Sequence, residues 1–314
     1  MKNLLFIILL AVTFSFNFTQ LSFAVCVEGP PDNWVCNTDD PNPDLQGVLD
    51  TFPAAPKTVT VLPGAGIDTL LPDNGANAIE TASQGDTITV TDGDLKSAVL
   101  TIETVQGDDK ITITNSSVLS TDGPCIDSSD DNDIVEIIDS ELDCNGSGVD
   151  GGGDNDTIIV RGSEITTDGS SPIRGANEND IATIEDSILN STDTAVSMGP
   201  GDDRVNLRNG AVLNGIVDCG SGNLDTVAFQ MDVPEEALGF FGSRIAALVP
   251  GTIQTIEIND LTFELESCEI FLNELVGIEN VRPIPTLSEW GLIAMAGVLG
   301  IAGLMVIRRR KVTA

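Results

Sequence analysis

Aspartate recurs at a near-constant spacing through the middle of the chain, always immediately before a short stretch of alternating apolar residues. Successive aspartates are 22–24 residues apart, and they open the sequences DTITV, DKITI, DIVEI, DTIIV, DIATI, DRVNL and DTVAF. Because Ca²⁺ prefers oxygen ligands, such a column can offer one cation-binding carboxylate per repeat. The candidate Ca²⁺ ligands are Asp86, Asp109, Asp133, Asp156, Asp180 and Asp203, and Asp225 continues the series.

Glycine and a second polar residue precede several of these aspartates. The turns VQGDD, GGDND and GPGDD, which end at Asp109, Asp156 and Asp203, resemble half of the Ca²⁺-binding nonapeptide repeat of RTX proteins. In RTX proteins that repeat occurs twice per coil, whereas here the motif occurs once per repeat. Two interpretations therefore stay open. The aspartates bind Ca²⁺, which is the one cofactor suggested although none is required, or their charge is relieved by hydrogen bonds from turn amides.

Paired carboxylates could also support glycoside hydrolysis, because that reaction needs two carboxyl groups at a suitable separation. Adjacent pairs occur at Asp108–Asp109, Asp130–Asp131 and Asp202–Asp203, but they follow the period of the repeat. The chain has no His, and rings that could stack on sugars are scarce, since it has no Tyr and only two Trp. We therefore predict that the protein is not an enzyme, with a polysaccharide-active β-helix enzyme as the alternative.

Six cysteines permit disulfides in an oxidising compartment. The candidate pairs are Cys26 with Cys36, Cys219 with Cys268, and the remaining Cys125 and Cys144. Spacing alone leaves the connectivity open. A Zn²⁺ site is disfavoured, because the chain has no His and no Cys-x-x-Cys motif.

The elements that position the aspartates follow from the same repeat. The second and fourth residues after each aspartate are apolar, which is the pattern of a strand with one buried face. A small residue stands seven positions after the aspartate (Gly93, Ser116, Ser140, Ser163, Ser187 and Gly210), and an apolar residue follows two positions later. A third apolar column lies seven positions before the aspartate.

Three short strands per repeat indicate an all-β fold, namely a right-handed parallel β-helix of about seven coils. One coil cannot bury its inward residues alone, but stacked coils share a continuous core. The expected β-helix covers 58–229. Residues 25–57 are the expected N-terminal cap and 230–281 the C-terminal cap, in which 235–249 predicts one amphipathic helix followed by strands.

The charge of the chain excludes one class of partner. It has 49 acidic and 14 basic residues, which gives a formal net charge of −35. A body this negative repels nucleic acid and anionic lipid, so we expect neither as a ligand.

Both ends of the chain predict export. Residues 1–24 read as a signal peptide, with a positive start, an apolar stretch and a small-residue cleavage site. Near the other end stands the motif IPTLSEWG, formed by Ile284, Pro285, Thr286, Leu287, Ser288, Glu289, Trp290 and Gly291. The apolar run 292–307 follows and, together with Gly291, is just long enough to span a bilayer as a helix with adjustment at the interfaces. A basic cluster of Arg308, Arg309, Arg310 and Lys311 ends the run and should remain cytoplasmic.

This tail, residues 282–314, resembles the IPTL-CTERM sorting domain of exported proteins from Gram-negative bacteria that have an exosortase. The resemblance implies that an exosortase-like enzyme in the inner membrane recognises the segment, cleaves it and passes the body to the surface. A permanent membrane anchor is the alternative. The precursor is then expected in the inner membrane with a cytoplasmic C-terminus, and the mature form at the cell surface or outside the cell.

Together these features predict a non-catalytic cell-surface or extracellular-matrix protein whose β-helix is a rigid, acidic spacer or adhesive module. Its candidate partners are the exosortase-like enzyme and an extracellular polysaccharide or other surface ligand. A Ca²⁺-dependent, adhesin-like binder is the first alternative, and the polysaccharide-active enzyme is the second.

Overall fold

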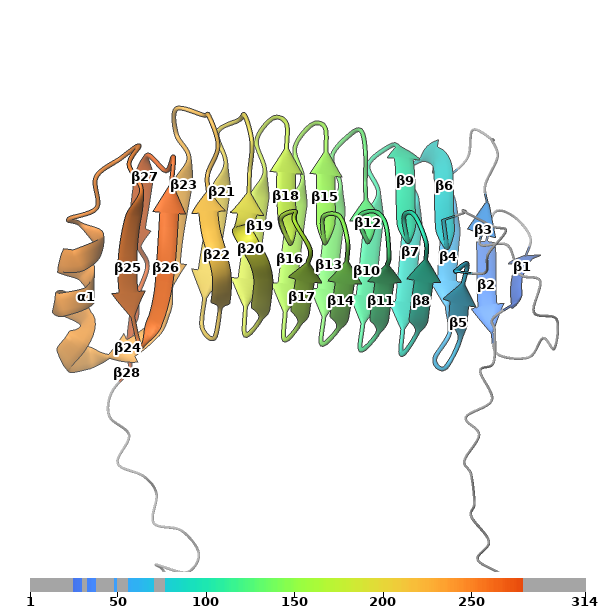
Figure 1. The fold of residues 1–314 in the computed structure, drawn as a ribbon, viewed down its shortest axis with the longest axis horizontal. Coiled ribbons are helices and arrows are strands. Elements are labelled where there is room, and N and C mark those ends of the chain that lie inside the picture. The colour runs from blue at the N-terminus through green and yellow to red at the C-terminus, as the bar shows by residue number, and fades with distance from the viewer. Residues whose placement is uncertain (1–24, 30–32, 38–47, 50–55, 71–76, 279–314) are drawn as a thin grey trace, which may run out of the picture.

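The computed structural model describes residues 25–29, 33–37, 48–49, 56–70 and 77–278. These residues form an elongated parallel β-solenoid with one short helix at its C-terminal end (Figure 1). The predicted all-β solenoid of about seven coils is therefore confirmed. The predicted signal peptide, residues 1–24, and the predicted sorting tail, residues 282–314, lie outside the described residues.

The strand that follows each column aspartate belongs to one continuous sheet, which we call the first ladder. It begins with an antiparallel pair, β1 and β2, and every later pair is parallel. Its strands, in spatial order, are β1 (Val25–Gly29), β2 (Asn33–Asn37), β4 (Thr58–Val61), β7 (Thr87–Thr91), β10 (Lys110–Thr114), β13 (Ile134–Ile138), β16 (Thr157–Arg161), β19 (Ile181–Glu185), β21 (Arg204–Arg208), β23 (Thr226–Gln230) and β27 (Ile270–Asn273).

The other two sides of the solenoid are formed by a second and a third ladder. The second contains β5 (Gly66–Asp68), β8 (Asp94–Ser97), β11 (Ser117–Ser120), β14 (Glu141–Cys144) and β17 (Glu164–Thr167). The third contains β3 (Val48–Leu49), β6 (Ile79–Gln84), β9 (Ile102–Gln106), β12 (Ile126–Asp127), β15 (Val149–Gly152) and β18 (Ile173–Ala176). The two ladders merge at β20 (Ile188–Ser197), which pairs with both β17 and β18, and β22 (Val212–Asp218) continues from it.

The core is the set of inward columns that the period-two pattern predicts. In the first ladder, the residues two and four positions after each aspartate are at most 1 % exposed, from Ile88 and Val90 to Val227 and Phe229. One column prediction is wrong in the coil that follows Asp203. An extra residue in the turn shifts the register, so Ala211 and Leu213, rather than Gly210 and Val212, align with Ser187 and Leu189.

The C-terminal end is closed by a mixed cap. It contains β24 (Asp232–Pro234), a 3₁₀ turn at Glu235–Ala237, α1 (Leu238–Ile245), β25 (Gln254–Ile258), β26 (Leu261–Glu266) and β28 (Val276–Ile278). The helix expected over 235–249 is thus shorter, and two physical causes account for this. Gly239 and Gly242 weaken it from within, and Pro250 disfavours helical backbone at the residue before it.

Three disulfides join neighbouring parts of the solenoid. Cys26–Cys36 links β1 to β2, Cys125–Cys144 links adjacent coils, and Cys219–Cys268 links the last coil to the cap. No helix within the described ranges is long and apolar enough to cross a membrane. The apolar run 292–307 is outside those ranges.

Candidate functional site

The column aspartates lie inside the solenoid, at the turn that precedes each strand of the first ladder. The parallel register stacks them directly above one another, one per coil. All seven are at most 2 % exposed, namely Asp86, Asp109, Asp133, Asp156, Asp180, Asp203 and Asp225. They are therefore part of the core and not of the solvated surface.

One carboxyl oxygen of each aspartate replaces a missing backbone partner. The Oδ1 atom accepts a hydrogen bond from the backbone N–H at the same position of the preceding coil, at 2.5–2.9 Å. The series starts at the N–H of Lys57 and runs without interruption to Asp225. Because a buried amide without a partner is costly, these side chains continue the strand ladder through the turn.

The second carboxyl oxygen has a different environment. In Asp156, Asp180 and Asp203, Oδ2 is buried and accepts no hydrogen bond. A Cβ atom at Gly151 or Gly175 would collide with the Oδ2 atom of Asp156 or Asp180, so glycine provides the space that this oxygen occupies.

Burial changes the acidity of the column. Removal from water raises the pKa of Asp109, Asp156 and Asp203 to about 7, and that of Asp133 and Asp180 to about 8. The amide hydrogen bond from the preceding coil lowers the pKa, and neighbouring carboxyl groups raise it. Near neutral pH these five aspartates are therefore partly protonated, which relieves the repulsion between carboxylates about 4.8 Å apart.

The candidate Ca²⁺ ligands thus form a single column with one aspartate per coil. One carboxyl oxygen of each already accepts a hydrogen bond from a backbone amide. No group of three or more His, Cys, Asp or Glu side chains in the described part of the chain is placed to hold a metal ion. The hydrogen-bond alternative has direct geometric support, because every column aspartate receives a turn amide.

The polar residues before five of the column aspartates form a further row of hydrogen bonds, the Asn/Asp ladder, which the sequence analysis missed. The backbone N–H of Asn155 donates to Oδ1 of Asn132, and Asn179 donates in turn to Asn155, both at 3.2 Å. The side-chain amides repeat the same contacts at 3.0 Å, and Asp108 and Asp202 extend the ladder at its two ends. Its signal in the sequence is an Asp or Asn directly before the column aspartate in five successive coils.

A groove runs along the corner between the first and second ladders, with a volume of about 830 Å³. The serine column lines it, and each serine accepts the backbone N–H of the preceding coil on Oγ at 3.0–3.1 Å. Left-handed residues make the corner, with φ of 47–59° at Asp92, Asn115, Asp139, Gly162 and Asp186. Such conformations favour Asn, Asp and Gly.

The groove is strongly acidic. Its lining carboxylates are Asp68, Asp92, Asp94, Asp139, Glu141, Glu164 and Asp186, whereas Lys96 is the basic side chain that lines it. The small-residue column was predicted from the repeat, but the groove was not. Its signal is the Asp, Asn or Gly that precedes each small residue.

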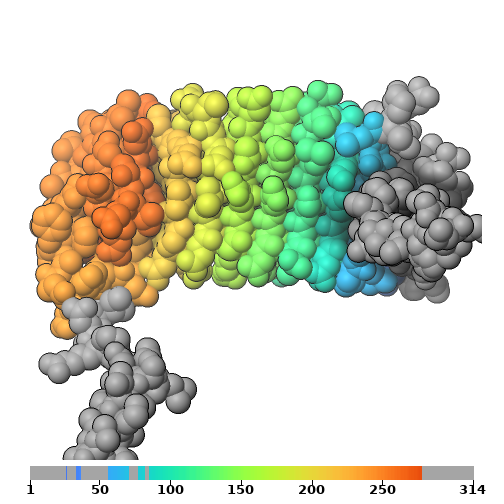
Figure 2. Space-filling model, turned by 60° about the horizontal axis from the view of Figure 1, so that its bottom comes forward, coloured from blue at the N-terminus to red at the C-terminus, as the bar shows by residue number. Residues whose placement is uncertain are grey.

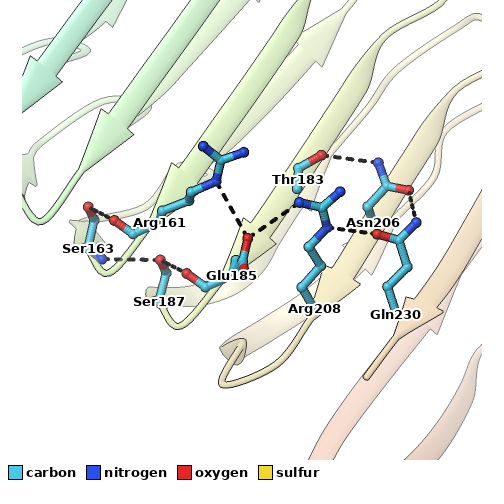
Figure 3. A network of polar contacts seen from close by, with 8 residues as sticks. All are labelled: Arg161, Ser163, Thr183, Glu185, Ser187, Asn206, Arg208 and Gln230. Atoms are coloured by element: carbon cyan, nitrogen blue, oxygen red, sulfur yellow. Dashed lines mark hydrogen bonds and ion pairs between the residues drawn. The ribbon is translucent and has the colours of Figure 1, made fainter. Parts of the chain in front are cut away.

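The outer face of the first ladder carries a polar network near its C-terminal end (Figure 3). Glu185 lies between Arg161 and Arg208, at 3.5 and 3.4 Å, and Nε of Arg208 donates to Gln230 at 2.7 Å. The pairs are partly exposed, so each stabilises the fold by about 1 kcal/mol or less. Since every member bonds to a neighbouring coil, we interpret the network as lateral bracing of the sheet.

Comparison with known proteins identifies the tail. Residues 282–311 match the family model of the IPTL-CTERM motif. The predicted sorting residues, Ile284 to Gly291 and Arg308 to Lys311, fall within this match and outside the described residues. Neither the curated proteins nor the solved structures contain a match to the chain. The chain thus carries an IPTL-CTERM sorting tail, which covers about a tenth of its length, behind a β-solenoid body.

Proposed function

We propose that this protein is made as an exported precursor, that an exosortase-like enzyme processes its tail, and that its body acts at the cell surface or in the extracellular matrix. The observation that carries the proposal is the IPTL-CTERM match at 282–311. An exosortase-like enzyme in the inner membrane is the partner that this motif implies.

In the precursor, the apolar run 292–307 spans the inner membrane as a helix. Together with Gly291 the apolar stretch has 17 residues, about 26 Å as a helix, and it spans the hydrocarbon core with adjustment at the interfaces. The cluster Arg308–Lys311 keeps the C-terminus in the cytoplasm, because translocating several positive charges is unfavourable. Cleavage near Ile284–Gly291 then separates the body from its anchor.

The body acts without catalysis, as a rigid and acidic module. Its core consists of packed apolar columns, and the buried aspartates beside them each accept a backbone amide. In the adjacent pair Asp108–Asp109, both carboxylates already accept structural hydrogen bonds: Asp109 accepts the N–H of Asp86, and Asp108 accepts the N–H of Asn132. A right-handed winding of the coils follows the usual preference for parallel strands.

The corner groove is the surface on which we place an extracellular polysaccharide. Carboxylates accept hydrogen bonds from sugar hydroxyls, and the groove repeats its polar lining once per coil, about every 4.8 Å. An extended glycan can therefore lie along the solenoid and meet similar groups at successive sugars. The excess of carboxylates selects neutral or positively charged glycans over anionic ones.

Fractionation in an exosortase-containing host tests this function. The wild-type chain is compared with a variant in which Ile284, Pro285, Thr286 and Leu287 are replaced by Ala while 292–311 are unchanged. We expect the wild type at the surface and the variant retained in the inner membrane, because the variant keeps the membrane span but lacks the recognised motif. Equal surface delivery of both chains, or delivery in a host without the enzyme, would contradict the proposal.

A further inference from the structure

The most exposed apolar side chains gather at the C-terminal end of the solenoid. Five large apolar residues of the described chain are more than half exposed: Leu224 (56 %), Phe240 (59 %), Val249 (55 %), Ile253 (66 %) and Val276 (56 %). Four of them belong to the C-terminal cap, and Leu224 lies just before β23. Large exposed apolar side chains concentrated at one end of a soluble body indicate a contact surface.

The same end carries the longest stretch without carboxylates. Residues 237–256 contain no Asp or Glu, and no other run between residues 28 and 278 is as long. Their single charge is Arg244, whose guanidinium lies 5.7 Å from the ring centre of Phe240. We call the exposed side chains of this segment the acid-free surface (237–256); Glu257 borders it and lies 3.9 Å from Arg244. In a chain with 49 acidic residues, it is the part that an apolar interface repels least.

Packing explains why this surface faces outward. The inner side of α1 buries Ile245 and packs Leu238 and Phe241 against the end of the core. Phe240 is adjacent in the chain and therefore points to the other side of the helix, where it is exposed. Figures 1 and 2 show α1 and β25–β27 forming the end of the stack, beyond the last repeat coils.

The described chain also ends at this side. Its last strand, β28, pairs with β24 directly before the helical segment of the cap. Only residues 279–291 separate Ile278 from the apolar run 292–307. A linker of this length spans at most about 45 Å when fully extended, so the cap is tethered close to the membrane. Because the tether keeps the cap at a high effective concentration near the bilayer, even a weak contact between the cap and the membrane can be populated.

We propose that, in the precursor, the acid-free surface of the C-terminal cap docks on the outer face of the bilayer, with Phe240, Val249 and Ile253 at the lipid interface. The proposal rests on the proposed function, in which 292–307 spans the membrane. The aromatic ring, the apolar side chains and the neighbouring Arg244 suit the boundary between headgroups and acyl chains. Docking would stand the solenoid on its cap and hold the linker 279–291 near the membrane, where the processing enzyme works.

The test uses the full chain reconstituted in phosphatidylcholine vesicles whose acyl chains are brominated. Ile253→Trp places a fluorescent reporter on the acid-free surface, and Val99→Trp places a matched one in the turn between β8 and β9, where Val99 is 45 % exposed. Each is compared with the wild-type chain, which supplies the background of Trp34 and Trp290. We expect bromine quenching of the Ile253→Trp reporter and none of the Val99→Trp reporter.

A second substitution tests the cause. Adding Phe240→Glu to the Ile253→Trp chain removes one apolar contact and adds a charge, which lowers the ratio of docked to undocked protein about tenfold and reverses the quenching. If the chain floats with the vesicles but the Ile253→Trp reporter is unquenched, the docking proposal is wrong and the membrane span stands. If the chain does not float, the membrane span itself is wrong. If the Ile253→Trp reporter is instead shielded from solvent without lipid, and this shielding increases with protein concentration, the surface binds a second copy of the chain and the proposal is wrong.

Discussion

Replacing one buried column aspartate by its neutral isostere should stabilise the protein in alkaline solution and leave it unchanged in acid. Asp156 is the most informative position. Its side chain is 2 % exposed, its Oδ1 accepts the N–H of Asp133 at 2.8 Å, and its Oδ2 is buried without a partner. The substitution Asp156→Asn keeps the size of the side chain and the accepting oxygen but removes the ionisation.

The direction follows from the pKa of Asp156, which burial raises from 3.8 to about 7. Between these pH values the unfolded chain releases the proton and the folded chain holds it, so folding takes up a proton. The free energy of unfolding is therefore greatest below about pH 4, falls as the pH rises towards 7, and then levels off. The full loss at this one site is about 4 kcal/mol, and relaxation around the charge reduces it to about 2–4 kcal/mol.

Thermal unfolding at pH 4 and pH 8.5 measures this effect. In a domain of this size 1 kcal/mol changes Tm by about 2–4 °C, so Asp156→Asn should raise Tm by about 4–16 °C at pH 8.5 and by less than about 2 °C at pH 4. The matched control is Asp154→Asn, which removes a charge from the same turn at an exposed position and should change Tm little at either pH. A fall in Tm at pH 8.5, or an equal rise at both pH values, would refute the protonated column. A fall that appears only in millimolar Ca²⁺ would instead assign Asp156 to a metal site.

Three further predictions concern the packing of the coils. Gly152→Ala should destabilise the protein by more than about 2 kcal/mol, because the added Cβ atom would lie 1.9 Å from a carbonyl oxygen of the preceding coil. In the control Gly169→Ala, the added Cβ atom meets nothing within 4 Å, so the loss of stability should come only from the backbone strain of the positive φ. Urea unfolding measures the stability of both variants. Replacing both Cys125 and Cys144 by Ser should lower the stability by about 3 kcal/mol, as expected for a 19-residue loop, and a change below about 1 kcal/mol would exclude a stabilising crosslink. Ser140→Ala should cost about 1–2 kcal/mol by removing the acceptor of one corner amide, and an unchanged denaturation midpoint would contradict that function.

The repeat made most of the fold predictable from the sequence. Each strand carries its inward residues at period two, and each coil repeats them in register, so the positions of the core could be assigned without knowledge of long-range contacts. The exception arose in the coil after Asp203, where one inserted residue moved Ala211 and Leu213 into the inward columns. Counting by a fixed repeat length does not show where in a coil an extra residue is inserted, so it does not show which residues after the insertion point inward.

The chemistry of the column was less predictable. The sequence pattern of an aspartate before a strand is the same whether its side chain points outward and binds Ca²⁺ or points inward and accepts a hydrogen bond from a backbone amide. Only the direction of the side chain distinguishes the two cases. The helix length also depended on context, because its apolar pattern continued through Leu248 while Pro250 and the internal glycines shortened it. The groove arose from the left-handed corner residues, whose effect on shape appears only when successive coils are stacked.

The intact mass of the surface-located protein tests the central claim most directly. The protein is recovered from the surface fraction of an exosortase-containing host, and both ends of the mature chain are determined by mass spectrometry. We predict a mature chain that begins after residue 24 and ends before the apolar run 292–307, with the three disulfides intact. A surface or membrane form that retains Arg308, Arg309, Arg310 and Lys311 would show that the tail is a permanent anchor and would contradict the account.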